Sequence, residues 1–62
     1  MPWKIRIRRN GEVFHYATRD LQAAIAVTCL LLRDGMMVER IEGPEGLMIG
    51  SETVRPLCDG FG

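Results

Sequence analysis

Basic side chains recur at every second position near the start of the chain. Residues 3–8 alternate between apolar and basic types, and the one histidine follows at position 15. Alternation with a period of two is typical of a half-buried strand, so the basic side chains gather on its outward face. A face of this kind can bind phosphate groups, which indicates nucleic-acid binding as one candidate function. The candidate residues for that function are Lys4, Arg6, Arg8, His15 and Arg19.

The aromatic residues and the acidic residues argue against this function. Trp3, Phe14 and Tyr16 fall on the opposite, core-facing side, whereas proteins that bind single strands interleave aromatic and basic residues. Eight basic and eight acidic residues cancel, but the basic ones concentrate in residues 1–33 and the acidic ones in residues 34–62. Acidic side chains that cover the basic face would remove the nucleic-acid interpretation, and an open face would strengthen it. We therefore keep nucleic-acid binding as the alternative.

The other polar residues show no catalytic arrangement. His15 is a candidate general base, but no nucleophile or carboxylate is placed beside it by its spacing. The glycines at positions 43, 46 and 50 lack the Gly-Lys-Ser/Thr ending of a phosphate-binding loop. A zinc site needs about four ligands, and His15 with two distant cysteines does not supply them. We therefore predict no catalytic residue, no metal site and no cofactor.

One enzyme family is considered because of the first residues. Met1-Pro2, the apolar alternation as far as Ile7 and the length of 62 residues make the chain similar to small tautomerases of the 4-oxalocrotonate type. The resemblance implies that the amine of Pro2, freed by loss of Met1, would act as the general base. In that family the first strand leads directly towards a helix, whereas here a second strand intervenes and Met1 would block the amine. An N-terminal-proline tautomerase is the last alternative.

The two cysteines bear on the redox environment. Secreted proteins of this size usually carry about four to eight cysteines, so a pair predicts a reducing compartment. Cys29 lies in an apolar run and is expected to be buried, and Cys58 is expected to be exposed and reduced. A disulfide between them has no support from the sequence. No signal-peptide pattern is present, and the longest apolar stretch is shorter than the ~20 residues of a membrane span. We expect a cytoplasmic protein with no membrane association.

The first predicted element is a hairpin. Asn10-Gly11 favours a two-residue type I′ turn between strands of residues 3–9 and 12–17. The expected register pairs Arg9 with Glu12, Ile7 with Phe14, Ile5 with Tyr16, and Trp3 with Thr18. The apolar residues of these pairs share one face, while Arg6 lies opposite His15 on the other.

A helix and a second hairpin are predicted after it. The helix runs from about Arg19 to Asp34, with Thr18 as its N-cap and Gly35 as its left-handed terminator. The second hairpin joins residues 36–42 and 47–54 through a loop at residues 43–46, and Pro56 ends its last strand. Its alternation is poorer, because Val38 and Ile41 fall on opposite faces.

The predicted helix is apolar on two faces. One face, expected to cover the sheet, carries Leu21, Ile25, Cys29 and Leu32. A second face lies roughly opposite, and so short a chain has little to bury it except a second copy. The predicted dimer-interface residues are Ala23, Ala24, Val27, Leu30 and Leu31. Exchange of a hairpin between copies at Gly35, or coverage by Leu57 and Phe61 of the C-terminal tail, are the alternatives.

Length and composition complete the prediction. A length of 62 residues and a hydrophobic content of 47% predict one small globular domain. We predict an α+β fold in ββαββ order, with one helix packed on a small antiparallel sheet of two hairpins and completed by homodimerisation. The domain spans residues 1–56, and residues 57–62 form an irregular tail. The expected function is a non-catalytic interaction module whose partner is a second copy of the chain.

Overall fold

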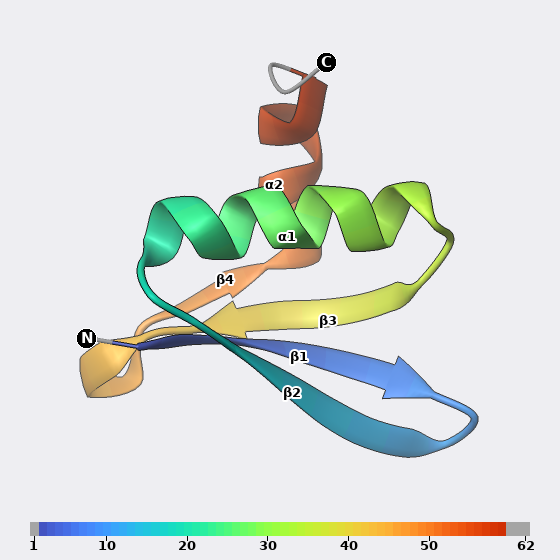
Figure 1. Cartoon of the computed structure of the whole chain (residues 1–62), viewed down its shortest axis with the longest axis horizontal. Helices are drawn as coiled ribbons and strands as arrows, with labels where there is room; N and C mark the ends of the chain where they lie inside the picture. The colour runs from blue at the N-terminus through green and yellow to red at the C-terminus, as the bar shows by residue number, and fades with distance from the viewer. Residues whose placement is uncertain (1, 60–62) are drawn as a thin grey trace.

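An antiparallel sheet with two helices packed on it makes up the structure, a computed structural model that describes residues 2–59 (Figure 1). The fold is α+β, as predicted, and the strand order is β2-β1-β3-β4. The strands are β1 (Trp3–Arg9), β2 (Glu12–Thr18), β3 (Met37–Glu42) and β4 (Met48–Gly50). The helices are α1 (Leu21–Arg33) and α2 (Ser51–Cys58), and a short 3-10 turn, η1 (Pro44–Gly46), joins β3 to β4.

The first hairpin confirms the predicted turn and register. Asn10 and Gly11 have φ values of 53° and 81°, the positive values that a two-residue I′ turn requires. Arg9 pairs with Glu12, and each following pair of residues faces as expected, ending with Trp3 opposite Thr18. The alternation of residue types and the turn therefore set the same register.

β3 contains an irregularity that the sequence pattern concealed. Ile7 of β1 lies opposite Val38, while Arg6 lies opposite Arg40, so Glu39 is an extra residue on β3. In a bulge of this kind, two residues of one strand lie opposite one residue of its neighbour. The extra residue shifts the alternation by one position, so residues on both sides of the bulge can point towards the core. Val38 and Ile41 are consequently both buried, and the expectation that they face opposite sides was wrong.

α1 begins two residues later than predicted and ends one residue earlier, with Gly35 as its terminator as predicted. Asp20, not Thr18, is the N-cap, and its carboxylate accepts a hydrogen bond of 2.8 Å from the backbone N–H of Ala23. The Thr18 hydroxyl instead donates to the carbonyl of Trp3 at 2.9 Å, which ties it to the hairpin. Gly35 has a φ of 82°, and the N–H of Met36 donates to the carbonyl of Leu31, which completes a Schellman ending.

The second hairpin is shorter than predicted, because a helix replaces the second half of its last strand. β4 ends at Gly50, and residues 51–58 form α2, which includes Pro56 within the helix. Val54 and Cys58, four residues apart, lie on the same side of α2, where Val54 enters the core and Cys58 bonds to Cys29. Leu57 and Cys58 of the expected tail thus belong to a helix, and residues 60–62 lie outside the described part.

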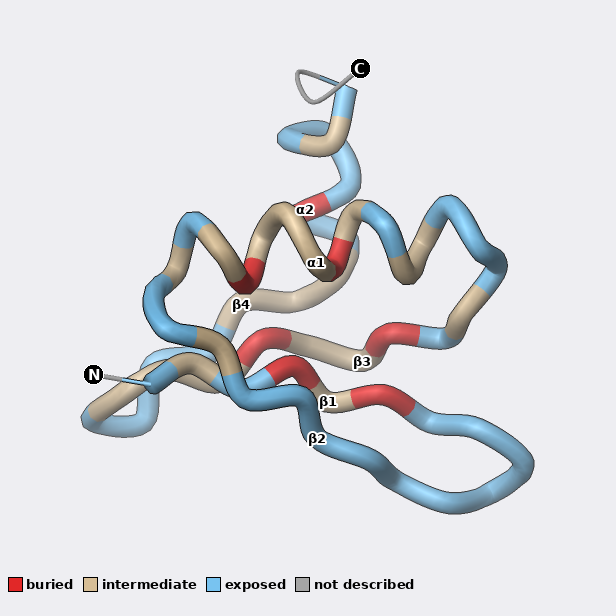
Figure 2. The backbone as a smooth tube through the Cα atoms, in the orientation of Figure 1, coloured by how far each residue is buried: buried red, intermediate tan, exposed pale blue. Residues whose placement is uncertain are grey.

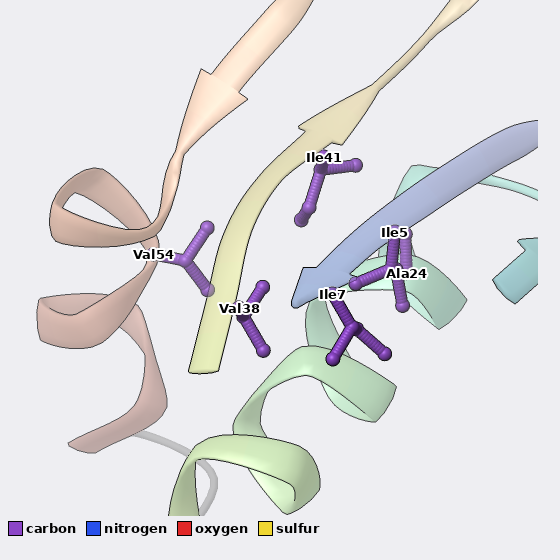
Figure 3. Close-up of a cluster of buried hydrophobic side chains, with 6 residues drawn as sticks. All are labelled: Ile5, Ile7, Ala24, Val38, Ile41 and Val54. Atoms are coloured by element: carbon purple, nitrogen blue, oxygen red, sulfur yellow. The ribbon is translucent and has the colours of Figure 1, made fainter. Parts of the chain in front are cut away.

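The core lies between the sheet and the helices (Figure 3). Six apolar side chains are buried there: Ile5, Ile7, Ala24, Val38, Ile41 and Val54. On α1 the side that meets the sheet carries Ala24 and Thr28. The side predicted to face the sheet therefore differs from the observed one by a rotation about the helix axis. Cys29 is turned towards α2 by its disulfide, and the small Ala24 lets α1 approach the sheet. No helix within residues 2–59 is long and apolar enough to cross a membrane.

Candidate functional site

β2 presents large apolar side chains that the fold leaves uncovered. Phe14 and Tyr16 lie on the same face of the hairpin as the buried Ile5 and Ile7, yet 47% and 53% of their surfaces are exposed. Figure 2 shows β2 exposed along nearly its whole length. The sequence placed both aromatic residues in the core, and the structure places them at its edge.

The width of α1 explains this exposure. A helix is about 10 Å across with its side chains, and neighbouring strands are about 4.8 Å apart, so one helix covers about two strands. α1 lies over the two central strands and α2 packs against β3 and β4, while β2 forms the edge farthest from α2 (Figure 1). If the strand order had been known, comparing the number of strands with the number of helices would have indicated that this edge of the sheet is uncovered.

The side of α1 that faces away from α2 continues this apolar region. Val27 lies about 160° round the helix from Cys29, which bonds to α2, so Val27 is on the side nearer β2. Val27 and Leu31 are half-buried against the core. Leu30 is 59% exposed, but it lines the groove between α1 and α2 and so lies outside this region. Ala24 is fully buried within the chain, so its expected place on a free helix face was wrong. The remaining predicted interface residue, Ala23, is half-buried.

A groove lies on the strand part of this region. Phe14, Tyr16, Ile7 and Met36 line a hollow of about 240 Å³ at the end of α1, together with Arg9 and His15. We call the set formed by Phe14, Tyr16, Met36 and the β2 side of α1 (Ala23, Val27, Leu31) the apolar surface. Its aromatic rings supply large contact area with few rotatable bonds, which suits a protein contact.

Comparison with known proteins adds no family. No protein-family model, curated protein or solved structure matches the chain. The geometry of the described residues is therefore the basis for a functional assignment.

The opposite face of the sheet is charged, and its glutamates, Glu39 and Glu42, pair with arginines. The Nε of Arg6 lies 2.6 Å from one carboxylate oxygen of Glu39, and the Nε of Arg8 lies 2.9 Å from the other. These hydrogen bonds, from Arg8 and then Arg6, lower the pKa of Glu39 below its usual value. The bulge positions Glu39 for both arginines, because the extra residue adds a side chain to the outward face.

A second carboxylate lies beside His15. The Nε of Arg40 donates to Glu42 at 2.8 Å, and the Nε2 of His15 lies 3.7 Å from the other oxygen of Glu42. The hydrogen bond from Arg40 lowers the pKa of Glu42. His15 lies opposite Arg6 as predicted, and Lys4 lies opposite Glu42. Acidic side chains of β3 thus pair with Arg6, Arg8 and Arg40, while the face as a whole still carries more basic than acidic side chains. This pairing weighs against nucleic-acid binding but does not cover the whole basic face.

A disulfide joins the two helices. Cys29 and Cys58 are bonded, with their Cα atoms 5.4 Å apart, so the expectation of a reduced Cys58 was wrong. A groove of about 580 Å³ lies beside this bond and is lined by both helices, and Arg33, Arg55 and Asp59 are the charged residues of its lining. The spacing of two cysteines by 28 intervening residues carries no signal that would have predicted the pairing.

The remaining residues that the sequence indicated as candidates lie before β1, between β2 and α1, or outside the described part of the chain. Arg19, in the connection between β2 and α1, is exposed. Pro2 precedes β1, and β2 separates β1 from α1, the difference from the tautomerase order that the sequence indicated. Met1 lies outside the described residues. Within residues 2–59, no group of three or more His, Cys, Asp or Glu side chains is placed to hold a metal ion.

Proposed function

We propose that the protein is a non-catalytic interaction module that forms a homodimer through the apolar surface. The observation that carries this proposal is the exposure of Phe14 and Tyr16 beside the free side of α1. Fully burying an aromatic or large aliphatic side chain contributes about 1.5–3 kcal/mol. Covering several of them is comparable with the whole stability of a domain of this size. A second copy supplies an identical apolar surface, and two-fold pairs are the commonest oligomers.

The tail does not take the place of a second copy within the described residues. Leu57 is 49% exposed and belongs to α2, which packs on the side of α1 opposite to the apolar surface. Phe61, the other tail residue expected to cover α1, lies outside the described part. Exchange of a hairpin across Gly35 is a separate variant of a homodimer, in which β3 would pair with β1 of the other copy. In the structure described, β3 pairs with β1 of its own chain.

The disulfide supports a different compartment from the one that the sequence indicated. Disulfides persist in oxidising environments and are rare in the cytosol. The Cys29–Cys58 bond ties α2 to α1, so it is part of the protein's architecture. We therefore place the interaction module in an oxidising compartment, in place of the cytoplasm expected from the number of cysteines.

Sedimentation equilibrium over a range of protein concentrations tests the homodimer. We expect twice the chain mass for the wild type, and a shift towards the monomer for Tyr16→Ser. Leu57→Ser is the matched control, because Leu57 is similarly exposed but lies on α2; this variant is expected to keep the dimer. A wild-type protein that stays monomeric at millimolar concentration would overturn the proposal.

A further inference from the structure

β2 is a long free edge without the features that usually protect such an edge. Among the described strands it pairs only with β1, and it spans seven residues, whereas the other edge strand, β4, has three. Natural edge strands are commonly short, bulged, or interrupted by charged residues and proline. After Glu12, β2 has no proline and no Asp, Glu, Lys or Arg, and its pairing with β1 is regular. The edge is therefore able to accept another strand.

The turn determines which backbone groups face outward. In the two-residue turn at Asn10-Gly11, the flanking residues Arg9 and Glu12 form a hydrogen-bonded pair. Such pairs alternate along an antiparallel ladder, so the even-numbered residues of β2 direct their N–H and C=O groups towards β1. Val13, His15 and Ala17 therefore direct theirs to the free edge.

We propose that two copies of the chain join along β2, antiparallel, with His15 at the two-fold axis, so that two four-stranded sheets become one sheet of eight strands. This register uses all three outward-facing residues: Val13 pairs with Ala17 of the second copy, His15 with His15, and Ala17 with Val13. A two-fold axis at Val13 or Ala17 would use fewer of them. The inference rests on the proposed homodimer and specifies its geometry.

The side chains on the edge are complementary to themselves in this register. Phe14 of one copy faces Tyr16 of the other on the helix side of the sheet, in the closely spaced pairs that lie between the hydrogen-bonded ones. The two exposed rings of each copy thus meet the two rings of the second. The end that carries Glu12 meets the end that carries Thr18 and Arg19, which places opposite charges near each other at both ends.

The distance between the two α1 helices distinguishes this strand-paired dimer from a dimer in which one α1 packs directly on the other. α1 lies over β1 and β3, so the two α1 helices would be about 19 Å apart across the paired β2 strands, given ~4.8 Å between strands. Helices in direct contact are about 8–10 Å apart. In the strand-paired dimer the four aromatic rings occupy the space between the helices, and the β2 sides of α1 form its walls.

Cysteine cross-linking tests the register. Residues that form a hydrogen-bonded pair have Cα atoms about 5.5 Å apart, within the range of a disulfide. We expect His15→Cys to form a covalent dimer rapidly under mild oxidation, with the new bond identified by peptide mass spectrometry. Val13→Cys is the matched control: it is on the same edge, but its two copies lie about 14 Å apart in this register. That variant should cross-link far more slowly.

A proline variant tests the edge itself. Ala17→Pro removes an N–H that faces outward, so β1 and β2 keep their ladder while the seam loses a donor. We expect a folded monomer, judged by circular dichroism and sedimentation. If Ala17→Pro does not fold, the cross-linking result decides alone.

The outcomes separate this inference from the homodimer on which it rests. Slow cross-linking of His15→Cys in a protein that sediments as a dimer would overturn strand pairing and leave the homodimer standing. Rapid cross-linking of Val27→Cys in its place would identify packing through α1. A monomeric wild type would overturn both. Rapid linkage at position 15 together with slow linkage at position 13 supports the proposed seam.

Discussion

Glu39 makes the stability of the charged sheet face depend on pH. Its two carboxylate oxygens accept hydrogen bonds from Arg8 and Arg6, which lower its pKa below the usual 4.5. A carboxyl group with a lowered pKa in the folded state stabilises that state when it is ionised. The contribution is present above pH ~4.5 and is lost as the pH falls through the lower pKa of the folded protein.

Substitution of this residue should reveal that dependence. We expect Glu39→Gln to lower the melting temperature at pH 7 by a few degrees, because the arginines lose their charged acceptor. The difference from the wild type should shrink as the pH falls through the lowered pKa of Glu39 in the folded protein, because the wild-type carboxylate then becomes protonated. Thermal melts from pH 3 to pH 7 measure this. Glu45→Gln, on the exposed turn, should show no such convergence; a constant difference for Glu39→Gln would contradict the ion-pair explanation.

Thr28 places a hydroxyl in the core without a partner. The residue is fully buried, and its Oγ1 makes no hydrogen bond with the described residues. Because an unsatisfied buried polar group is costly, Thr28→Val should raise the free energy of unfolding by about 1 kcal/mol. Thr28→Ser keeps the hydroxyl and loses the methyl group, so it should lower that free energy by a similar amount. Urea denaturation measures both, and a destabilised Thr28→Val would show that the hydroxyl has a stabilising partner.

At the scale of elements, Gly43 determines how the β3–β4 connection meets the hairpin. A Cβ atom at this position would overlap the six-membered ring of Trp3, so the ring packs directly on the glycine backbone. Gly43→Ala should therefore lower the free energy of unfolding by about 1–3 kcal/mol. The test is a double-mutant cycle by denaturant unfolding. The same substitution should cost clearly less in a Trp3→Leu background, and an equal cost in both backgrounds would contradict the packing explanation.

The elements differ in how far the sequence could predict them. The first hairpin was predictable in register because a turn at Asn10-Gly11 and a strict alternation act locally and agree. The second half was not, because the bulge at Glu39 breaks the alternation and Pro56 resembles the end of a strand. α2 depends on tertiary contacts, the burial of Val54 and the bond to Cys29, which override local preference.

The candidate site was predictable only in part for the same reason. The sequence indicated an unpartnered side of α1. Val27 and Leu31 lie on the side away from Cys29 and its bond to α2, whereas Leu30 lines the groove between α1 and α2. The sequence could not indicate that β2 is the edge strand, because strand order depends on the pairing of β1 with β3, distant in the chain. Phe14 and Tyr16 were therefore assigned to the core, and their exposure, which makes the apolar surface, became visible only from the topology.

At the scale of the whole molecule, the disulfide compensates for a small core. Six apolar side chains are buried within residues 2–59, and domains of about 60 residues leave a large share of their surface exposed. The bond joins residues 29 apart in the sequence and closes a long loop that holds β3, η1, β4 and α2. Cross-linking such a loop stabilises the fold mainly by limiting the unfolded chain.

Reduction should therefore destabilise the protein strongly. For a closed loop of about 30 residues, the chain-entropy model gives roughly 3–4 kcal/mol, which corresponds to a fall in melting temperature of roughly 15 °C or more. Thermal melts with and without reductant, with thiol titration to verify reduction, measure the effect. The double variant Cys29→Ala/Cys58→Ala should melt near the reduced wild type and should not respond to reductant. A fully reduced wild type that keeps its melting temperature would show that packing of Val54 alone holds α2, and the support for an oxidising compartment would fall with it.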